Sequence, residues 1–231
     1  MTELLIESLP LMLLGALNAF AVTIASLIIG VPVGLILALM RISEKRKLKI
    51  FALIYIEVWR AVPFIVEIFI VFFILPPLLN QWFQIDISAF QTMVIGSTLW
   101  TSANSAEVFR GAIQSIPLGQ TEAAISLGMS YFQRLRLVIF PQALKITLPP
   151  MIGIFTLVLK GTAIGFIIDF RDLIRMGQIA IERIYIQERI LASLEIYTII
   201  MIIYFFMCYP LSQLSLYFER KLSTSNGEKS K

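Results

Sequence analysis

Two ionisable side chains lie deep inside apolar stretches of this 231-residue sequence, where they could do chemistry. Glu67 follows Pro63 among isoleucines and phenylalanines, and Lys160 lies within a second apolar stretch. A charge at membrane depth is costly, so such residues are functional candidates by default. A carboxylate and an ammonium group lining one polar cavity could contact the two charged ends of a zwitterionic substrate. The alternative is a buried salt bridge between Glu67 and Lys160 that fixes helix packing.

Two further charges, Glu57 and Arg60, precede Glu67 on the same apolar stretch. At about 100° per residue, all three fall on one face of a continuous helix. Pro63 could bend that face. Because Glu57 and Arg60 are three residues apart, the pattern favours a structural ion pair between them.

The sequence lacks the residues that several kinds of catalytic and metal-binding site require. The sequence has no histidine, which excludes His-dependent triads and His-ligated zinc. Its single cysteine, Cys208, lies in an apolar run and is interpreted as a small buried hydrophobe. No glycine-rich phosphate-binding loop occurs. We therefore expect no catalytic residue, no metal site and no cofactor in this chain, so any ATP must bind to another subunit.

The elements that would position these residues are membrane-spanning helices. The chain is 58% hydrophobic and only 15% charged, and its uncharged stretches approach or exceed the roughly 20 residues that cross a bilayer. This composition predicts an all-α integral membrane protein. The five expected transmembrane helices cover residues 9–40, 51–79, 87–106, 146–168 and 196–218.

These helices form one expected transmembrane domain, residues 1–221, followed by a disordered tail at 222–231. Basic residues gather in the 41–49 loop, the 110–145 insert and the tail, whereas the segment 169–189 carries as many acids as arginines. The positive-inside rule therefore places the insert and the C-terminus in the cytoplasm and the N-terminus outside.

The insert from Arg110 to Lys145 is polar between two apolar segments. Four breakers bracket two helix-capable runs at 120–127 and 131–139; they are Pro117, Gly119, Gly128 and Pro141. Such an element would present a short helix beyond the bilayer surface, where a soluble partner could meet it.

The insert carries a resemblance to a known family. Glu122-Ala123-Ala124, then Gly128, then Pro141 resemble the EAA loop of bacterial ABC-importer permeases. The flanking segments resemble the polar amino-acid importers for histidine, glutamine and arginine. The resemblance implies that the loop acts as a cytoplasmic coupling helix; the implied ATPase-coupling residues are Gly119, Glu122, Ala123, Ala124, Gly128 and Pro141. Arg60 and Thr162 lie in segments of the same resemblance and join Glu67 and Lys160 as candidate substrate-pathway residues.

The resemblance also implies partners. An ATP-binding subunit would hold ATP and magnesium, a second permease would complete the pathway, and an extracellular or periplasmic binding protein would deliver the substrate. The segments 169–189 and 76–86 are the expected docking surface for that protein. The chain would lie in the bacterial cell membrane in contact with lipid, and no nucleic acid is implied.

One part of the pattern departs from the family. Members often carry an acid directly after the lysine that matches Lys160, and some carry a second acid seven residues before the first. This chain has Gly161 and Ile154 at these two positions. A cationic substrate is thus less expected than cystine or a neutral amino acid. The missing acids slightly favour a heterodimer over a homodimer.

Two rival functions remain open. An ion-gradient-driven secondary transporter could use Glu67 as its coupling-ion site, but such proteins usually show internal repeats and more spans. A membrane-embedded enzyme would need clustered catalytic groups, which this sequence lacks.

Overall fold

The chain is a bundle of helices with two projections. This computed structural model describes residues 2–84 and 86–227, and within them every regular element is helical. The α-helices are α1 (Thr2–Ile42), α2 (Arg46–Ala61), α3 (Phe64–Phe83), α4 (Ala89–Gln114), α5 (Leu118–Ser126), α6 (Tyr131–Arg134), α7 (Phe140–Gly161), α8 (Leu173–Glu188) and α9 (Ser193–Gly227). A π-helical segment, Leu135–Ile139, precedes α7 and a 3-10 segment, Thr162–Ile168, follows it.

Four stretches are long and apolar enough to cross a membrane among the residues described. They are Leu4–Ile42, Phe64–Trp82, Tyr131–Ile168 and Ser193–Leu222. The expected span 87–106 lies on α4, which is long enough to cross a membrane. It is less apolar than the four candidate spans because it carries serines, threonines and charges. The protein is therefore an all-helical membrane protein with four clear candidate spans.

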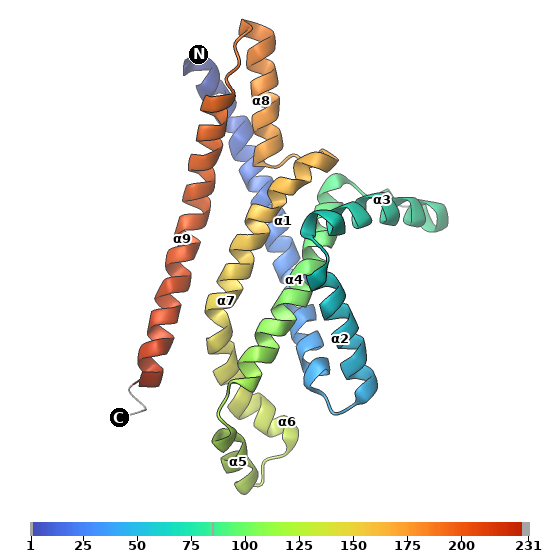
Figure 1. Ribbon diagram of the computed structural model, residues 1–231, viewed down its shortest axis with the longest axis vertical. Helices are drawn as coiled ribbons and strands as arrows, with labels where there is room; N and C mark the ends of the chain where they lie inside the picture. The colour runs from blue at the N-terminus through green and yellow to red at the C-terminus, as the bar shows by residue number, and fades with distance from the viewer. Residues whose placement is uncertain (1, 85, 228–231) are drawn as a thin grey trace.

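The expected span 51–79 is not one helix. Val62 is extended (φ −72°, ψ 129°) between α2 and α3, because proline lacks an N–H and disfavours helical backbone in the residue before it. After Pro63 the chain turns, and α3 projects sideways from the bundle (Figure 1). The inference that Glu57, Arg60 and Glu67 share one helical face is therefore wrong, since the break interrupts the helical phase between Arg60 and Glu67.

The tail also differs from expectation. Helix α9 continues to Gly227, so residues 222–227 are helical rather than disordered, and 228–231 lie outside the described residues. Pro210 lies inside this helix. The C-terminal end of α9 lies at the same end of the bundle as α5 and α6 (Figure 1).

The centre of the bundle is a close crossing of α1 and α4. A Cβ atom on Gly30 would lie 2.9 Å from the Thr101 Cβ, and one on Gly34 would overlap the Ser105 Oγ. Ser105 Oγ donates to the Thr101 backbone carbonyl at 2.6 Å, which satisfies the hydroxyl within its own helix. Two glycines four residues apart thus let the helices approach closely, as small residues do between membrane helices.

A second cluster joins the N-terminal parts of α1 and α9 to α8. Its buried members are Met12, Leu173, Ala180, Ile184, Ala192, Ile196 and Ile200. This cluster fixes α8 alongside the first turns of α1 and α9 (Figure 1). The end of the bundle opposite to α5 is therefore a packed unit and not a loose loop.

Candidate functional site

The polar insert forms a compact projection at one end of the molecule. Helices α5 and α6 follow α4 and lead into α7, and they extend beyond the end of the bundle (Figure 1). Pro117 begins α5 with its fixed φ of −55°, and Gly128 ends it with φ +73°, a conformation that favours glycine. The backbone N–H of Met129 donates to the Ala124 carbonyl at 3.1 Å and closes the turn.

The second short helix is fixed by its own cap. Ser130 and Gln133 form a capping box at the start of α6, which satisfies two backbone N–H groups. Gln142, on the first turn of α7, donates to Gln120 on α5 at 3.4 Å. The projection thus follows α4 along the chain and contacts the first turn of α7 through this hydrogen bond.

Three large apolar side chains are exposed on α5 and directly after it. Leu118 is 77% exposed and Leu127 is 81% exposed, and Ile125 is exposed between them. Leu118 and Ile125 are seven residues apart and share one helical side, whereas Leu127 follows the last residue of the helix. Of the six residues implied by the EAA pattern, only Ala124 is buried; Gly119, Glu122, Ala123, Gly128 and Pro141 are exposed. The sequence pattern did not single out the exposed leucines.

The two charges at membrane depth do not meet. Glu67 is fully buried on the first turn of α3, beside the Trp100 backbone, yet neither carboxylate oxygen completes a hydrogen bond. Lys160 is exposed near the end of α7. The hypothesis of a Glu67–Lys160 salt bridge is therefore wrong for this conformation. Thr162 is also buried and donates to the Leu159 carbonyl at 2.8 Å, so it does not line an open path.

The remaining pathway candidate, Arg60, belongs to a charged cluster between helices. Arg110 pairs with Glu107 on α4 at 2.6 Å. Arg60 lies close enough to act on the charge of Glu107, and Glu57 on that of Arg110. The expected pair between Glu57 and Arg60 is not among the ion pairs of the described residues. Glu57 and Arg60 of α2 thus lie near the Glu107–Arg110 pair of α4, at the end of α4 that leads into the projection.

Helix α4 carries a row of buried hydroxyls that sequence reasoning missed. Thr92, Ser97, Thr98 and Thr101 each have a buried side-chain oxygen without a hydrogen-bond partner. Ser102 Oγ meets the Tyr55 hydroxyl of α2 at 2.8 Å. The available signal was the spacing of Ser97, Thr98, Thr101 and Ser102 at three and four residues, which places these four on one helical side. Thr92 lies outside this side. In the described part of the chain, no three acidic or sulfur ligands gather into a metal site.

The end of the bundle opposite to α5 carries a buried acid and two ion pairs at and near the start of α8. Asp172 is fully buried and caps α8 by accepting from the Arg175 backbone N–H at 2.9 Å. Burial raises the pKa of the Asp172 carboxyl to about 6. The Arg175 side chain pairs with Asp169 at 2.7 Å and Glu182 at 3.7 Å. This end presents both signs of charge around a fixed helix start.

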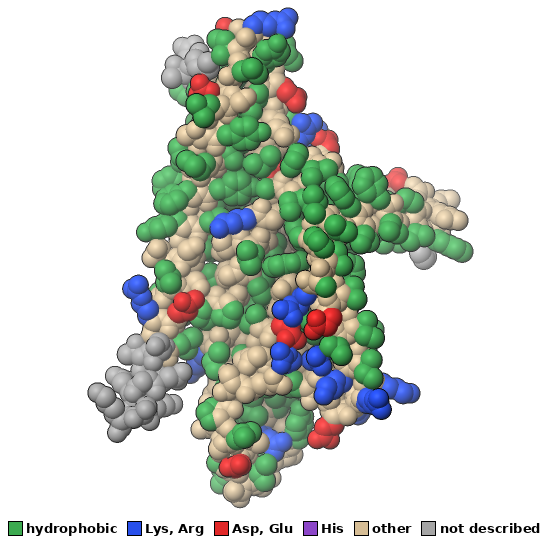
Figure 2. Space-filling view, viewed as in Figure 1, with side chains coloured by type: hydrophobic (Ala, Val, Ile, Leu, Met, Phe, Trp, Pro, Cys, Tyr) green, Lys and Arg blue, Asp and Glu red, His purple; other side chains and the backbone are tan. Residues whose placement is uncertain are grey.

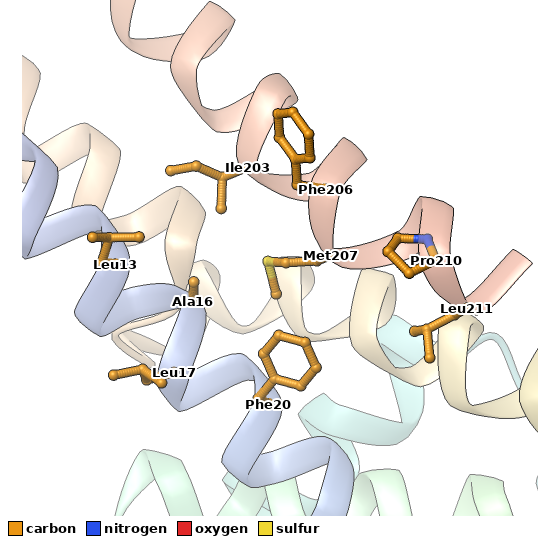
Figure 3. A pocket seen from close by; sticks show the side chains of 9 residues that line it. All are labelled: Leu13, Ala16, Leu17, Phe20, Ile203, Phe206, Met207, Pro210 and Leu211. Atoms are coloured by element: carbon orange, nitrogen blue, oxygen red, sulfur yellow. The ribbon is translucent and has the colours of Figure 1, made fainter. Parts of the chain in front are cut away.

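An apolar groove of about 820 Å³ lies between α1 and α9 (Figure 3). Side chains from both helices line it: Leu13, Ala16, Leu17, Phe20, Ile203, Phe206, Met207, Pro210 and Leu211. None of these side chains offers a hydrogen-bonding group apart from the weakly accepting methionine sulfur. The groove therefore does not suit a polar substrate.

Comparisons with known proteins agree with this architecture. The family model for the binding-protein-dependent transport system inner membrane component matches residues 30–224. The L-cystine transport system permease protein TcyB of Bacillus subtilis is 32% identical over 214 residues, covering 92% of this chain and 87% of that protein. The glutamate transport system permease protein GluD of Corynebacterium glutamicum is 32% identical over 206 residues, covering 88% and 72%.

Solved structures show the same likeness. A crystal structure of an amino acid ABC transporter with histidines matches with a TM-score of 0.81 and 36% identity, covering 94% of this chain and 96% of that one. The MetNI methionine ABC transporter, in an inward-facing conformation, matches with a TM-score of 0.71 at 20% identity and so shares the fold. The chain belongs to the binding-protein-dependent transport system inner membrane components, the permease subunits that form the membrane pathway of ABC importers while a separate subunit hydrolyses ATP.

Proposed function

We propose that this permease moves a polar amino acid into the cell and that α5 is its coupling helix. The observation that carries the proposal is the exposure of Leu118, Ile125 and Leu127 on a projection that joins α4 to α7. A rigid-body movement of the ATPase subunit would be transmitted through α5 into these two helices and open the pathway alternately to either side. The rival ion-gradient mechanism is not favoured, because it leaves this projection without a role.

The substrate class is inferred from relatives. TcyB is named for L-cystine and GluD for glutamate, and the solved structure is of an amino acid ABC transporter with histidines. All amino acids carry an α-carboxylate, and Lys160 is an exposed cation on a candidate span. An exposed charge at membrane depth normally faces a water-filled path. Lys160 would therefore hold the substrate carboxylate by a charge-assisted hydrogen bond.

The assembly completes the pathway. Five helices would cross the membrane. Helix α4 would be the most polar of them, and its polar side would face other helices rather than lipid. The α5 end would be cytoplasmic and the α8 end outside, where Asp169, Arg175 and Glu182 offer charges to the external binding protein. ATP and magnesium would bind to the partner ATPase. A second permease would face this one, with a non-identical partner slightly favoured because Gly161 and Ile154 replace acids of the family pattern.

The test is co-purification with the ATPase subunit. A double substitution, Leu118→Asp with Leu127→Asp, replaces the two most exposed leucines at the ends of α5 with charges. Full burial of each leucine is worth about 2 kcal/mol, so we expect ATPase binding to weaken by at least about a hundredfold. Ile186→Asp on α8 is the matched control, since Ile186 is 73% exposed at the opposite end. Undiminished ATPase binding by the double variant would contradict the role of α5.

A further inference from the structure

The connection between α1 and α2 combines a basic end with a free apolar face. Five basic residues and one acid, Glu44, lie between positions 41 and 49. Residues 44–50 are all exposed. The basic side chains are Arg41, Lys45, Arg46, Lys47 and Lys49. None of them takes part in the ion pairs found among the described residues.

This basic segment begins where an apolar span ends. Helix α1 contains the candidate span Leu4–Ile42, and Lys45 follows only three residues after it. The change from an uncharged stretch to five basic residues within nine positions is expected where a bilayer changes from hydrocarbon to headgroups. Figure 2 shows blue side chains gathered at this turn, next to green ones.

Helix α2 has two apolar faces. Ala52 and Ile56 are fully buried with Leu37 and Ala106 in the contact between α1, α2 and α4. On the other side, three large apolar side chains remain exposed at spacings of three and four residues; they are Phe51 (59%), Ile54 (58%) and Val58 (47%). This free face extends for about 10 Å along the helix, directly above the basic end.

We propose that the α1–α2 turn binds an anionic phospholipid, with its headgroup phosphate on Lys45, Lys47 and Lys49 and an acyl chain along the free face of α2. An amphiphile with a negative head matches both halves of the surface, which follow one another along a single helix. The inference rests on the proposed orientation, in which this end faces the cytoplasmic leaflet. An acidic surface of the ATPase is the competing occupant, but the turn ends short of α5 along the long axis (Figure 1), and a soluble partner would leave the apolar face uncovered.

The experiment measures lipid retention directly. The permease would be purified with its ATPase and analysed by native mass spectrometry after titration with phosphatidylglycerol or phosphatidylcholine. Each basic residue near a membrane strengthens binding to an anionic surface about fivefold, so the triple substitution Lys45→Gln, Lys47→Gln and Lys49→Gln weakens phosphatidylglycerol binding about a hundredfold. The matched control, with arginine at the same three positions, keeps the charge and retains the lipid. Binding of phosphatidylcholine is unchanged in both.

Three results would overturn the proposal. The first is equal phosphatidylglycerol retention by the glutamine and wild-type proteins. The second is loss of the ATPase from the glutamine variant with lipid retention intact, which would assign the surface to the ATPase. The third is a wild-type protein that does not prefer phosphatidylglycerol, a result independent of whether the variants fold. The single substitution Lys47→Gln, with an expected effect of about fivefold, provides a milder variant. Failure here leaves the α5 test untouched, because that test measures ATPase binding in a fixed lipid.

Discussion

Removing the buried charge of Asp172 should stabilise the protein at neutral pH and leave it unchanged in acid. Asp172 is fully buried, and burial raises the pKa of its carboxyl from 3.8 to about 6. This difference corresponds to about 3 kcal/mol between the two protonation states. Because the folded state holds the proton more tightly than the unfolded state, folding stability falls as pH rises from about 4 to about 6 and the full cost applies above pH 6.

The substitution Asp172→Asn removes the charge and keeps the cap. Asparagine is as good an N-cap as aspartate, and its side-chain oxygen can still accept from the Arg175 N–H. The stability difference between this variant and the wild type should therefore grow by about 2 kcal/mol between pH 4.5 and pH 7.5. For a chain of this length that is a relative rise of about 4–8 °C in the unfolding midpoint.

The assay is a thermal unfolding scan of the purified permease in detergent at a series of pH values, reported as variant minus wild type. Asp169→Asn is the control, because Asp169 is an exposed acid whose surface pair with Arg175 is worth about 1 kcal/mol or less. A difference for Asp172→Asn that does not change with pH, or that shrinks as pH rises, would refute the reasoning.

Three further substitutions test the packing that holds the pathway and the projection. Gly34→Val forces a side chain onto Ser105 at the crossing of α1 and α4 and should lower stability by about 1–3 kcal/mol, measured as a lower unfolding midpoint. Gly128→Ala meets no neighbouring atom but must adopt a φ of +73°, so we expect a cost of about 1 kcal/mol, seen as faster proteolysis within 118–134 with the unfolding midpoint of the bundle unchanged. Ser88→Ala removes the cap of α4, in which Ser88 accepts from the Gln91 N–H at 3.2 Å, and should cost about 1 kcal/mol; an unchanged midpoint in this variant would contradict the assigned cap.

Much of the fold was predictable because membrane helices are recognised by the length of apolar runs. The ranges 9–40, 146–168 and 196–218 each fall within a candidate span. The polar insert was predictable from its breakers, since Pro117 and Gly128 act locally on the backbone. Proline 63 was visible as a bend, but the direction of α3 after it depends on packing against α4, which no local rule provides.

The pathway residues were harder to predict. Burial of Glu67 and exposure of Lys160 depend on how α3 and α7 are rotated against α4. One helical wheel cannot describe residues on both sides of Pro63, because the helix is broken there. The family pattern identified α5 but not its exposed leucines, because Leu118 and Leu127 resemble core residues in a sequence that is mostly apolar. Spacing alone could not separate a lipid-facing leucine from a partner-facing one.

The most direct test of the account is amino-acid uptake into proteoliposomes that contain the permease, its ATPase and its binding protein, with ATP supplied to the ATPase side. Cystine, glutamine, histidine and arginine would be compared for the wild type, Lys160→Gln and Glu67→Gln. We predict ATP-dependent uptake that Lys160→Gln lowers by at least about tenfold, through loss of a charge-assisted hydrogen bond, while Glu67→Gln keeps the substrate preference. Uptake driven by an ion gradient without ATP, or full uptake by Lys160→Gln, would contradict the account.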